Sequence, residues 1–308
     1  MAAYPVKEPC HVLLAVDGSE HSYAAAALLQ DLPLPQDCSV RALGVFLPRE
    51  AGNLYQYQQP LDKIQQDYEQ KGIRITTELL GGSPAEVIIE TARVNPTDLI
   101  VMGAKGLRAT LGIFLGGVAQ QVAEYSNRPV LIVRAPYAGL RRVLLVTDGS
   151  AYSQQAVEYL DHFPLPRGTD LKVLYVLPPP PLRRPIEGLQ RMPHRPDIPT
   201  PSEPEPLSAP TAIEEQEGKV LLQRTVERLR QILPADSGVT ISSLLRRGDA
   251  ATEIIDCVKS LQIDLIIAGS LGMSKGKGWK LGSVSRKLLH YAGCSILIVR
   301  EIVQTETS

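Results

Sequence analysis

The chain is built from two copies of one sequence unit, and this repeat limits the possible folds more than any other feature. Residues 11–48 align without gaps on residues 142–179, and Asp17 then lies opposite Asp148, 131 positions further on. Later in each copy DLIVMGAKG aligns on DLIIAGSLG, now 166 positions apart. Such self-similarity is typical of a repeated structural unit. We therefore predict domain 1 over residues 9–135 and domain 2 over residues 141–302.

Domain 2 carries 35 extra residues, which form a proline-rich insertion at about residues 178–213. Twelve of the 25 prolines fall between residues 178 and 210. Proline cannot donate in a strand ladder or continue a helix, so the segment from Pro178 to Pro210 is expected to be extended or disordered. Docking of a proline-recognising partner is an alternative, but a solvated insertion is the expectation.

Within each domain, short runs rich in β-branched residues alternate with amphipathic runs. In domain 1 the expected strands are residues 11–16, 39–46, 73–80, 98–103 and 128–134, and the expected helices are residues 22–32, 61–72, 84–94 and 118–126. The fourth strand, DLIVMG, is continuously apolar, which is typical of a strand buried on both faces. This alternation predicts an α/β fold, with a doubly wound parallel sheet of five strands in each of two tandem domains.

Charge and hydropathy narrow the classes of partner. The chain has 32 Lys and Arg against 33 Asp and Glu, so no excess positive charge attracts nucleic acid or an anionic membrane. No apolar run approaches the roughly 20 residues of a membrane helix. The N-terminus, MAAYPVKEPCH, has no apolar stretch of the kind found in signal peptides. We therefore expect a cytoplasmic protein that binds neither nucleic acid nor membrane.

The spacing of cysteine and histidine gives no sign of a metal or disulfide site. Cys10, Cys38, Cys257 and Cys294 are far apart in the sequence and form no CxxC pair, so unpaired, buried thiols are expected. None of the five histidines forms a metal-spaced pair. We therefore expect no metal site formed by the protein alone.

Two loops in each domain lie where ligands bind in such a sheet, outside the carboxyl ends of the strands. The first loop follows strand one and reads VDGSE at Asp17 and TDGSA at Asp148. The second follows strand four and is rich in glycine, as in GSLGMSKGKGWKLGS at residues 269–283. Glycine lets backbone N–H groups approach an anion, and the next helix adds its positive dipole. The second loop is therefore expected to bind phosphate; the alternative is a flexible loop in which Ser283 only caps a helix.

The spacing of Gly269, Gly272, Gly282 and Ser283 resembles the G-x2-G-x9-G-[S/T] signature of the universal stress protein family. The stretches VTDGS, DLIIAGSLG and CSILIVR are similar to that family as well. The resemblance covers both domains and leaves out the insertion. It implies a Rossmann-like fold of the adenine nucleotide alpha hydrolase type. It also implies that the last strands, RPVLIVR and CSILIVR, pair the domains as an intramolecular pseudo-dimer; a further homodimer is compatible with the sequence.

The resemblance implies ATP as the ligand, with Mg²⁺ brought only by the nucleotide. In the ATP-binding branch of the family the acidic residue after strand one lies near the nucleotide, which places Asp148 there. A backbone position at the end of strand two contacts adenine, which here is Val176. Lys275, Lys277 and Lys280 would add charge near the phosphates, or form a solvated loop surface. The residues implied for domain 2 are Val146, Asp148, Val176, Ala268, Gly269, Gly272, Gly282, Ser283, Val284 and Ser285.

Domain 1 departs from this pattern at the start of its last helix. It has Gly117 where domain 2 has Ser283, and Ala119 where domain 2 has Ser285, so two hydroxyl groups are missing, although Arg108 offers a compensating charge. A hydrogen bond to a charged group contributes about 1.5–3 kcal/mol. Domain 1 is therefore expected to bind nucleotide weakly or not at all. Its corresponding residues are Asp17, Val45, Gly103, Gly106, Gly116 and Gly117.

Three functions remain open: a nucleotide-binding regulatory module of the stress response, a slow ATP hydrolase, and a scaffold without a ligand. The first loop does not match the SGGxDS loop of the PP-loop ATP pyrophosphatases, and no GxxxxGK[ST] P-loop is present. No His or Glu is placed as a general base near the glycine-rich loop. We therefore expect a regulatory protein that binds ATP and has no dedicated catalytic residue.

Overall fold

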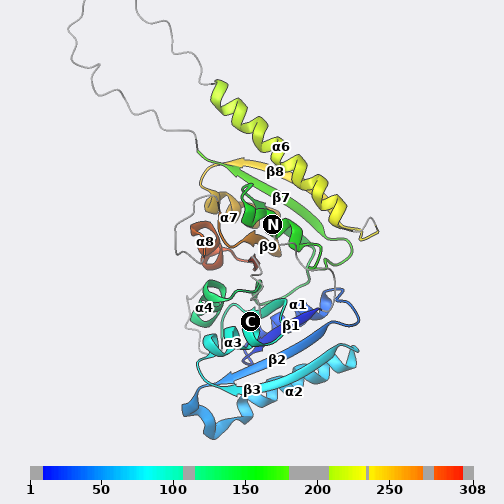
Figure 1. Ribbon diagram of the computed structural model, residues 1–308, viewed down its shortest axis with the longest axis vertical. Helices are drawn as coiled ribbons and strands as arrows, with labels where there is room; N and C mark the ends of the chain where they lie inside the picture. The colour runs from blue at the N-terminus through cyan, green and yellow to red at the C-terminus, as the bar shows by residue number, and fades with distance from the viewer. Residues whose placement is uncertain (1–9, 107–114, 180–207, 234–235, 273–280, 301–308) are drawn as a thin grey trace, which may run out of the picture.

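The computed structural model describes residues 10–106, 115–179, 208–233, 236–272 and 281–300, in which strands and helices alternate as predicted (Figure 1). The elements of domain 1 are β1 (His11–Val16), α1 (Glu20–Asp31), β2 (Ser39–Phe46), the 3-10 helix η1 (Pro48–Asn53), α2 (Tyr55–Gln70), β3 (Arg74–Gly81), α3 (Pro84–Val94), β4 (Leu99–Gly103), α4 (Gly117–Tyr125) and β5 (Val130–Val133). Those of domain 2 are β6 (Arg142–Thr147), α5 (Ala151–Tyr159), β7 (Asp170–Leu177), α6 (Ser208–Ile232), β8 (Thr240–Arg247), α7 (Ala250–Leu261), β9 (Leu265–Gly269), α8 (Ser283–Tyr291) and β10 (Ser295–Val299).

The ten strands of the described ranges join one sheet in the order β3-β2-β1-β4-β5-β10-β9-β6-β7-β8. Neighbouring strands are parallel within each domain. The domains meet where β5 and β10 run antiparallel, with Leu131 opposite Leu297. The doubly wound α/β fold is thus confirmed, and so is the pairing of the last strands. This pairing removes two exposed edges and makes the two five-stranded sheets continuous.

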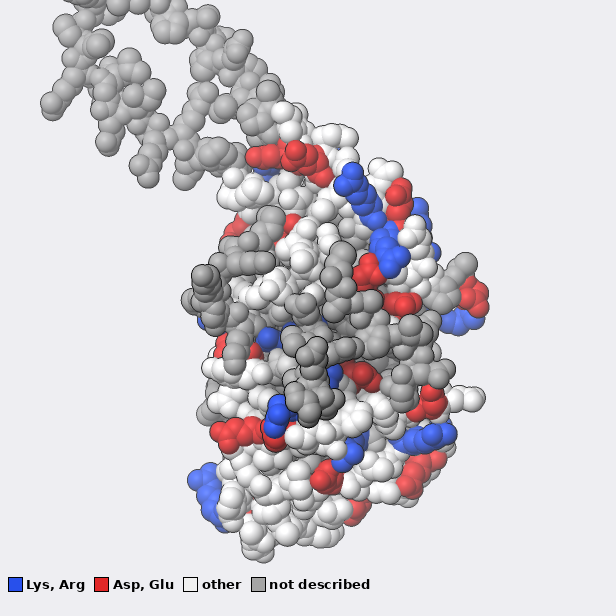
Figure 2. Space-filling view, viewed as in Figure 1, with Lys and Arg blue, Asp and Glu red and all other residues white. Residues whose placement is uncertain are grey.

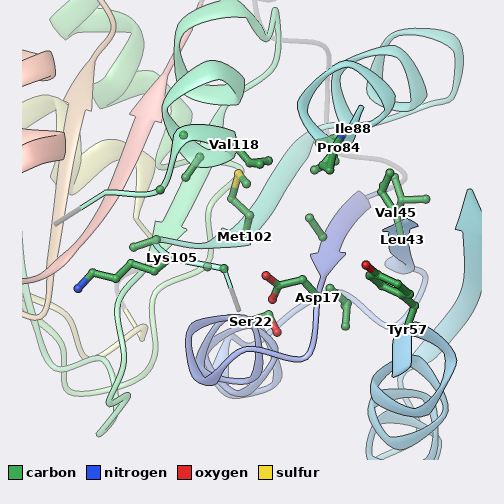
Figure 3. A pocket seen from close by; sticks show the side chains of 18 of the residues that line it. Asp17, Ser22, Leu43, Val45, Tyr57, Pro84, Ile88, Met102, Lys105 and Val118 are labelled. Carbon is green, nitrogen blue, oxygen red and sulfur yellow. The ribbon is translucent and has the colours of Figure 1, made fainter. Parts of the chain in front are cut away.

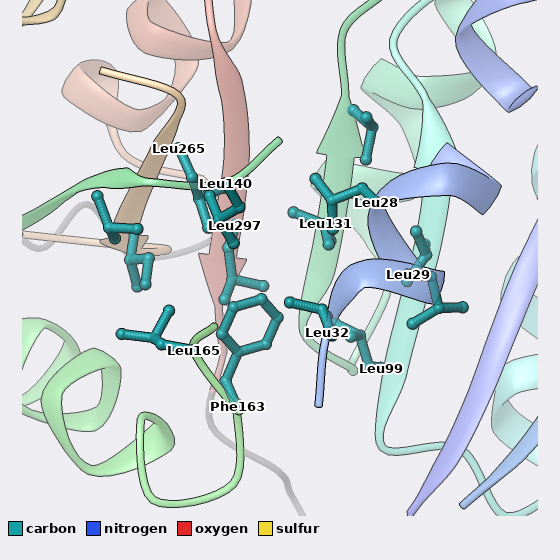
Figure 4. Close-up of a cluster of buried hydrophobic side chains, with 14 of the residues drawn as sticks. Leu28, Leu29, Leu32, Leu99, Leu131, Leu140, Phe163, Leu165, Leu265 and Leu297 are labelled. Atoms are coloured by element: carbon teal, nitrogen blue, oxygen red, sulfur yellow. The ribbon is translucent and has the colours of Figure 1, made fainter. Parts of the chain in front are cut away.

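Helices cover both faces of this sheet. Buried residues of α1, α2, α5 and α6 form a cluster on one face, and those of α3, α4, α7 and α8 form a cluster on the other. Because side chains alternate along a strand, Leu131 joins the first cluster and its neighbour Ile132 joins the second. The first cluster crosses the domain boundary, where Leu32 and Leu131 face Phe163 and Leu297 (Figure 4). Both domains therefore contribute to the same core cluster on this face.

Two arginines tie the domains together in matching ways. Arg134, which follows β5, donates to the carbonyl oxygen of Leu289 in the last turn of α8, at 2.7 Å. Arg300, which follows β10, donates to the carbonyl oxygens of Ala123 and Glu124 in the last turn of α4. Arginine satisfies carbonyl groups that have no partner within a helix end. Each of these two helices is therefore capped by the opposite domain.

The expectation for the end of the proline-rich insertion was wrong. Helix α6 begins at Ser208, so residues 208–210, at the end of that segment, are helical rather than extended or disordered. Pro210 is the third residue of the helix, where a missing N–H breaks no hydrogen bond within the helix. Residues 180–207 of the insertion lie outside the described residues.

The expectation of four unpaired thiols was also wrong for one pair. Cys10 and Cys38 form a disulfide, with their Cα atoms 4.4 Å apart. The parallel pairing of β1 and β2 brings the two together, because Ser39 N–H donates to Cys10 C=O at 2.8 Å. Cys257 and Cys294 are buried and unpaired, as expected.

The surface gives two further observations. On the face shown in Figure 2, acidic and basic side chains are interspersed over the described part of both domains. Within the same described ranges, no helix combines the length and the apolar character that a membrane span needs. Neither observation identifies a partner.

Candidate functional site

The carboxyl ends of β1 and β4 lie side by side where the strand order of domain 1 reverses. Strands β6 and β9 lie side by side in the same way in domain 2. Ligands of open α/β sheets bind at such positions. The loops predicted to hold a ligand follow these four strands, so the fold brings each pair of loops to one edge of the sheet.

The loop after the first strand holds an aspartate at this edge. Gly18 has a φ of +79°, and the equivalent glycine of domain 2 has +77°, a conformation that favours glycine. The turn lets Ser19 N–H donate to Asp17 Oδ1, and Ser150 N–H donate to Asp148 Oδ1, each at 3.0 Å. Both carboxylates are therefore oriented by the backbone of their own loop.

The first two glycines of the second loop allow a close approach of backbone and side chain. A Cβ atom on Gly106 would lie 2.6 Å from Asp17 Oδ2, and one on Gly272 would lie 2.7 Å from Asp148 Oδ2. A Cβ atom on Gly269 would lie 2.6 Å from a backbone oxygen of α5. These distances are shorter than van der Waals contact. Only glycine therefore lets the second loop reach the aspartate of the first.

The helices that follow the second loop begin at the same edge. Gly116 and Gly282 are the N-cap residues of α4 and α8, and neither cap makes a side-chain hydrogen bond. The first N–H groups of each helix have no partner within the helix, and together with the helix dipole they favour an anion. Ser283 is exposed at the first position of α8, whereas Gly117 occupies that position in α4.

Ser285 differs from Ser283 in its surroundings. Its side chain is buried, and its Oγ donates to the carbonyl oxygen of Gly269 at 2.9 Å. The hydroxyl therefore ties α8 to the end of β9. Ala119 takes its place in α4, where it is buried and has no hydroxyl to make this bond. Domain 1 has no counterpart of either hydroxyl. In domain 2 the Ser283 hydroxyl is exposed, whereas the Ser285 hydroxyl is buried and hydrogen-bonded to Gly269.

Domain 1 contains a cavity of about 440 Å³ at this edge, bounded by β1, β2, β4 and the start of α4 (Figure 3). This volume suits one small organic molecule. The structure brings all the residues predicted for domain 1 around it: Asp17, Val45, Gly103, Gly106, Gly116 and Gly117 line the cavity.

Other residues that line the cavity carry no motif in the sequence. Glu50 of η1 and Tyr57 of α2 lie at the end of the cavity near β2, and the Tyr57 hydroxyl donates to the Glu50 carboxylate. Lys105 lines it at the second loop, and Met102 and Leu115 add apolar wall. One signal was available in the sequence: η1 directly follows β2, whose end was expected to contact the ligand.

In domain 2 the predicted residues occupy the corresponding places. Val146 and Val176 lie near the carboxyl ends of β6 and β7, and with Val284 of α8 they pack, half-buried, on the cluster of α7 and α8. Ala268 and Gly269 are buried at the end of β9. Four further residues of the domain 2 loop and one of the domain 1 loop lie outside the described residues: Lys275, Lys277, Trp279, Lys280 and Arg108.

Two titratable side chains near these loops are held in their neutral forms. Burial raises the pKa of Tyr175 on β7, and the nearby Asp148 carboxylate raises it further. Burial lowers the pKa of His21, and the Lys105 ammonium lowers it further. The ring Nδ1 of His21 accepts the N–H of Ala135 at 2.9 Å, which also uses the neutral form. Near neutral pH His21 therefore offers no positive charge to a phosphate, and Tyr175 presents a neutral hydroxyl.

Comparisons with known proteins bear on both domains. A model described as the universal stress protein family matches residues 10–134 and 139–300. Universal stress protein MJ0531 of Methanocaldococcus jannaschii is 33% identical over 139 residues, which cover 41% of this chain and 82% of that protein. A universal stress protein of Mycolicibacterium smegmatis is 25% identical over 236 residues, or 75% and 71% of the two chains. The solved structure of a universal stress protein of Archaeoglobus fulgidus has the same fold, with a TM-score of 0.60 and 19% identity. The superposition covers 94% of this chain and 96% of that protein.

Proposed function

The chain belongs to the universal stress protein family, and from this premise we propose that it is an ATP-binding regulatory protein whose nucleotide is held mainly by domain 2. One observation carries the proposal: at the uncapped start of α8 the Ser283 hydroxyl is exposed, beside a loop that packs on Asp148. Backbone N–H groups, a helix dipole and a hydroxyl are the groups that bind phosphate in other nucleotide sites.

The rest of the proposed site follows from the neighbouring strands. The adenine would lie against Val176 at the end of β7, and the ribose and phosphates against Gly269, Gly272 and Gly282. Mg²⁺ would come with the phosphates of the nucleotide. Bound ATP would act as a sensing or switching ligand, since the sequence places no His or Glu as a general base near the glycine-rich loop.

Domain 1 has the same two loops and helix start as domain 2 but lacks the exposed hydroxyl at that helix start. Gly117 stands at the position of Ser283, so the start of α4 offers backbone N–H groups alone. One hydrogen bond to a charged group contributes about 1.5–3 kcal/mol. We therefore assign domain 1 a much weaker affinity for ATP than domain 2.

Ser283→Ala is expected to weaken ATP binding by roughly ten- to a hundredfold, because a charged hydrogen bond is lost and each 1.4 kcal/mol is about tenfold in Kd. Isothermal titration calorimetry with Mg-ATP measures the change. Ser243→Ala, at an exposed serine of β8, is the matched control and should bind like the wild type. Equal affinity in Ser283→Ala and wild type would contradict the asymmetry between the domains.

A ligand-free scaffold is the second candidate, favoured by the continuous sheet through β5 and β10, which needs no nucleotide to form. Mass spectrometry of the purified protein, with and without denaturation, distinguishes the two candidates. Co-purified adenine nucleotide supports the first. Absence of nucleotide, together with no thermal shift on adding Mg-ATP, supports the scaffold.

A further inference from the structure

The cavity of domain 1 has an apolar interior. Leu43, Ile88, Met102, Leu115 and Ala119 line it, and each is at most 5% exposed. These side chains come from β2, α3, β4, the second loop and α4, so the apolar wall surrounds the inner part of the cavity from several sides. Apolar surface of this kind favours an apolar ligand, because burying it releases water.

Among the described residues, three charged side chains line this cavity, and two of them are acidic. Asp17 lies at its inner edge, and the Glu50 side chain, only 15% exposed, lies near the β2 end. Arg49 is 3.9 Å from Glu50, but its side chain is 75% exposed and directed to solvent. The Lys105 side chain extends away from Asp17 and Tyr57 in Figure 3. A polyphosphate in this cavity would therefore meet the Glu50 carboxylate in addition to Asp17, whose equivalent Asp148 belongs to the proposed ATP site.

The corresponding segment of domain 2 has a different charge. After β2 domain 1 reads FLPREAGNLY, with Glu50 four residues beyond the strand. After β7 domain 2 reads PPPPLRRPIE, with two arginines before the first acidic residue, Glu187. At the 131-residue offset of the repeat Pro181 stands opposite Glu50, so the sequence of domain 2 has no carboxylate at this position. Together with Gly117 in place of Ser283, this points to different ligands.

We infer that the domain 1 cavity binds a neutral, largely apolar small molecule, which directs an N–H or O–H donor toward Glu50. The Glu50 carboxylate accepts from Tyr57 and lies 3.9 Å from Arg49 Nε, and the two oxygens of a carboxylate offer about four lone-pair sites in all. The cavity of about 440 Å³ accommodates one such molecule. This inference goes beyond the proposed ATP site of domain 2 and does not depend on it.

Two fluorescent probes that differ by one charge test the inference on the full chain. N-phenyl-1-naphthylamine is neutral, apolar and carries one N–H; 8-anilinonaphthalene-1-sulfonate has the same ring system with an added sulfonate. The neutral probe should bind with a stoichiometry of one and at least about tenfold more tightly, since like charges a few ångströms apart repel strongly in a poorly solvated site. Glu50→Gln should lower the ratio of the affinity for the neutral probe to the affinity for the sulfonate, because the carboxylate charge is removed. An equal or reversed preference in the wild type would overturn the inference.

Matched variants in the two domains locate the probe. Val45→Phe fills the cavity from β2 and should weaken the neutral probe by about tenfold or more. Val176→Phe, at the equivalent position of domain 2, should leave the probe unchanged and weaken ATP. Val118→Trp, at a 36% exposed lining position, is the second blocking variant in case Val45→Phe does not fold, which far-UV circular dichroism shows.

The outcomes separate this inference from the proposed function. Loss of the probe in the domain 1 variants, with ATP binding retained, supports it. Loss of both ligands in the domain 1 variants, with ATP displacing the probe, would make domain 1 the nucleotide site and overturn it. Failure of ATP to bind at all, with the probe still bound in domain 1, would contradict the proposed function alone.

Discussion

Gly272→Ala should lower the affinity of the chain for ATP by about a hundredfold or more, which corresponds to at least about 2.8 kcal/mol. The added Cβ would lie 2.7 Å from Asp148 Oδ2, so either the loop or the carboxylate must move. Movement of the loop displaces several phosphate-binding N–H groups together, whereas Ser283→Ala removes only one donor. The effect is therefore expected to exceed that of Ser283→Ala.

Gly106→Ala is the matched control for this experiment. It creates the same collision in domain 1, where the new Cβ would lie 2.6 Å from Asp17 Oδ2. Titration calorimetry with Mg-ATP should therefore find Gly106→Ala close to the wild type, with circular dichroism showing that both variants fold. The reverse pattern, ATP lost in Gly106→Ala and kept in Gly272→Ala, would place the nucleotide in domain 1 and refute our assignment.

Leu131→Ala and Leu297→Ala should each lower the free energy of unfolding by about 2–5 kcal/mol, the range for deleting buried leucine side chains. Both residues are fully buried, and they lie opposite each other where β5 meets β10. Because the side chains are direct cross-strand neighbours, the double variant should deviate from additivity by about 0.5–3 kcal/mol. Urea unfolding followed by far-UV circular dichroism measures all three values.

The repeat offers a control pair for this comparison of single and double variants. Leu14 of β1 and Leu145 of β6 are equivalent positions, both fully buried, and four strands lie between them. The losses in free energy of unfolding caused by their alanine variants should add within about 0.5 kcal/mol, since distant sites without shared partners are usually independent. If the losses in free energy of unfolding at Leu131 and Leu297 add as closely as those of the control pair, the two sides of the domain junction are not energetically coupled.

Much of the fold was predictable because the sequence contains it twice. The two copies agreed in their period-2 patterns, continuous apolar runs and helix starts. The structure has the bounds expected for the strand at residues 39–46 and for the helix at residues 84–94. Helix α2 begins six residues before the expected residue 61. The additional residues include Pro60, inside the helix, and Tyr57, which is buried with its ring centroid 6.3 Å from that of Phe46.

The site was predictable only where backbone geometry dictates residue type. Gly106 and Gly272 must lack a side chain to meet an aspartate, so they appear as a motif. Glu50 and Tyr57 meet through tertiary packing of η1 and α2, and no spacing rule brings them together. The disulfide of Cys10 and Cys38 likewise depends on the pairing of two strands 28 residues apart, which the cysteine spacing alone does not reveal.

The antiparallel junction of β5 and β10 has a consequence for how the two sites can diverge. A homodimer built through the same strands would carry two identical sites, and any substitution would change both at once. Here the strands that meet belong to one polypeptide. A change at Gly117 therefore demands no change at Ser283. The chain keeps the architecture of a symmetric dimer while each half is free to specialise for a ligand of its own.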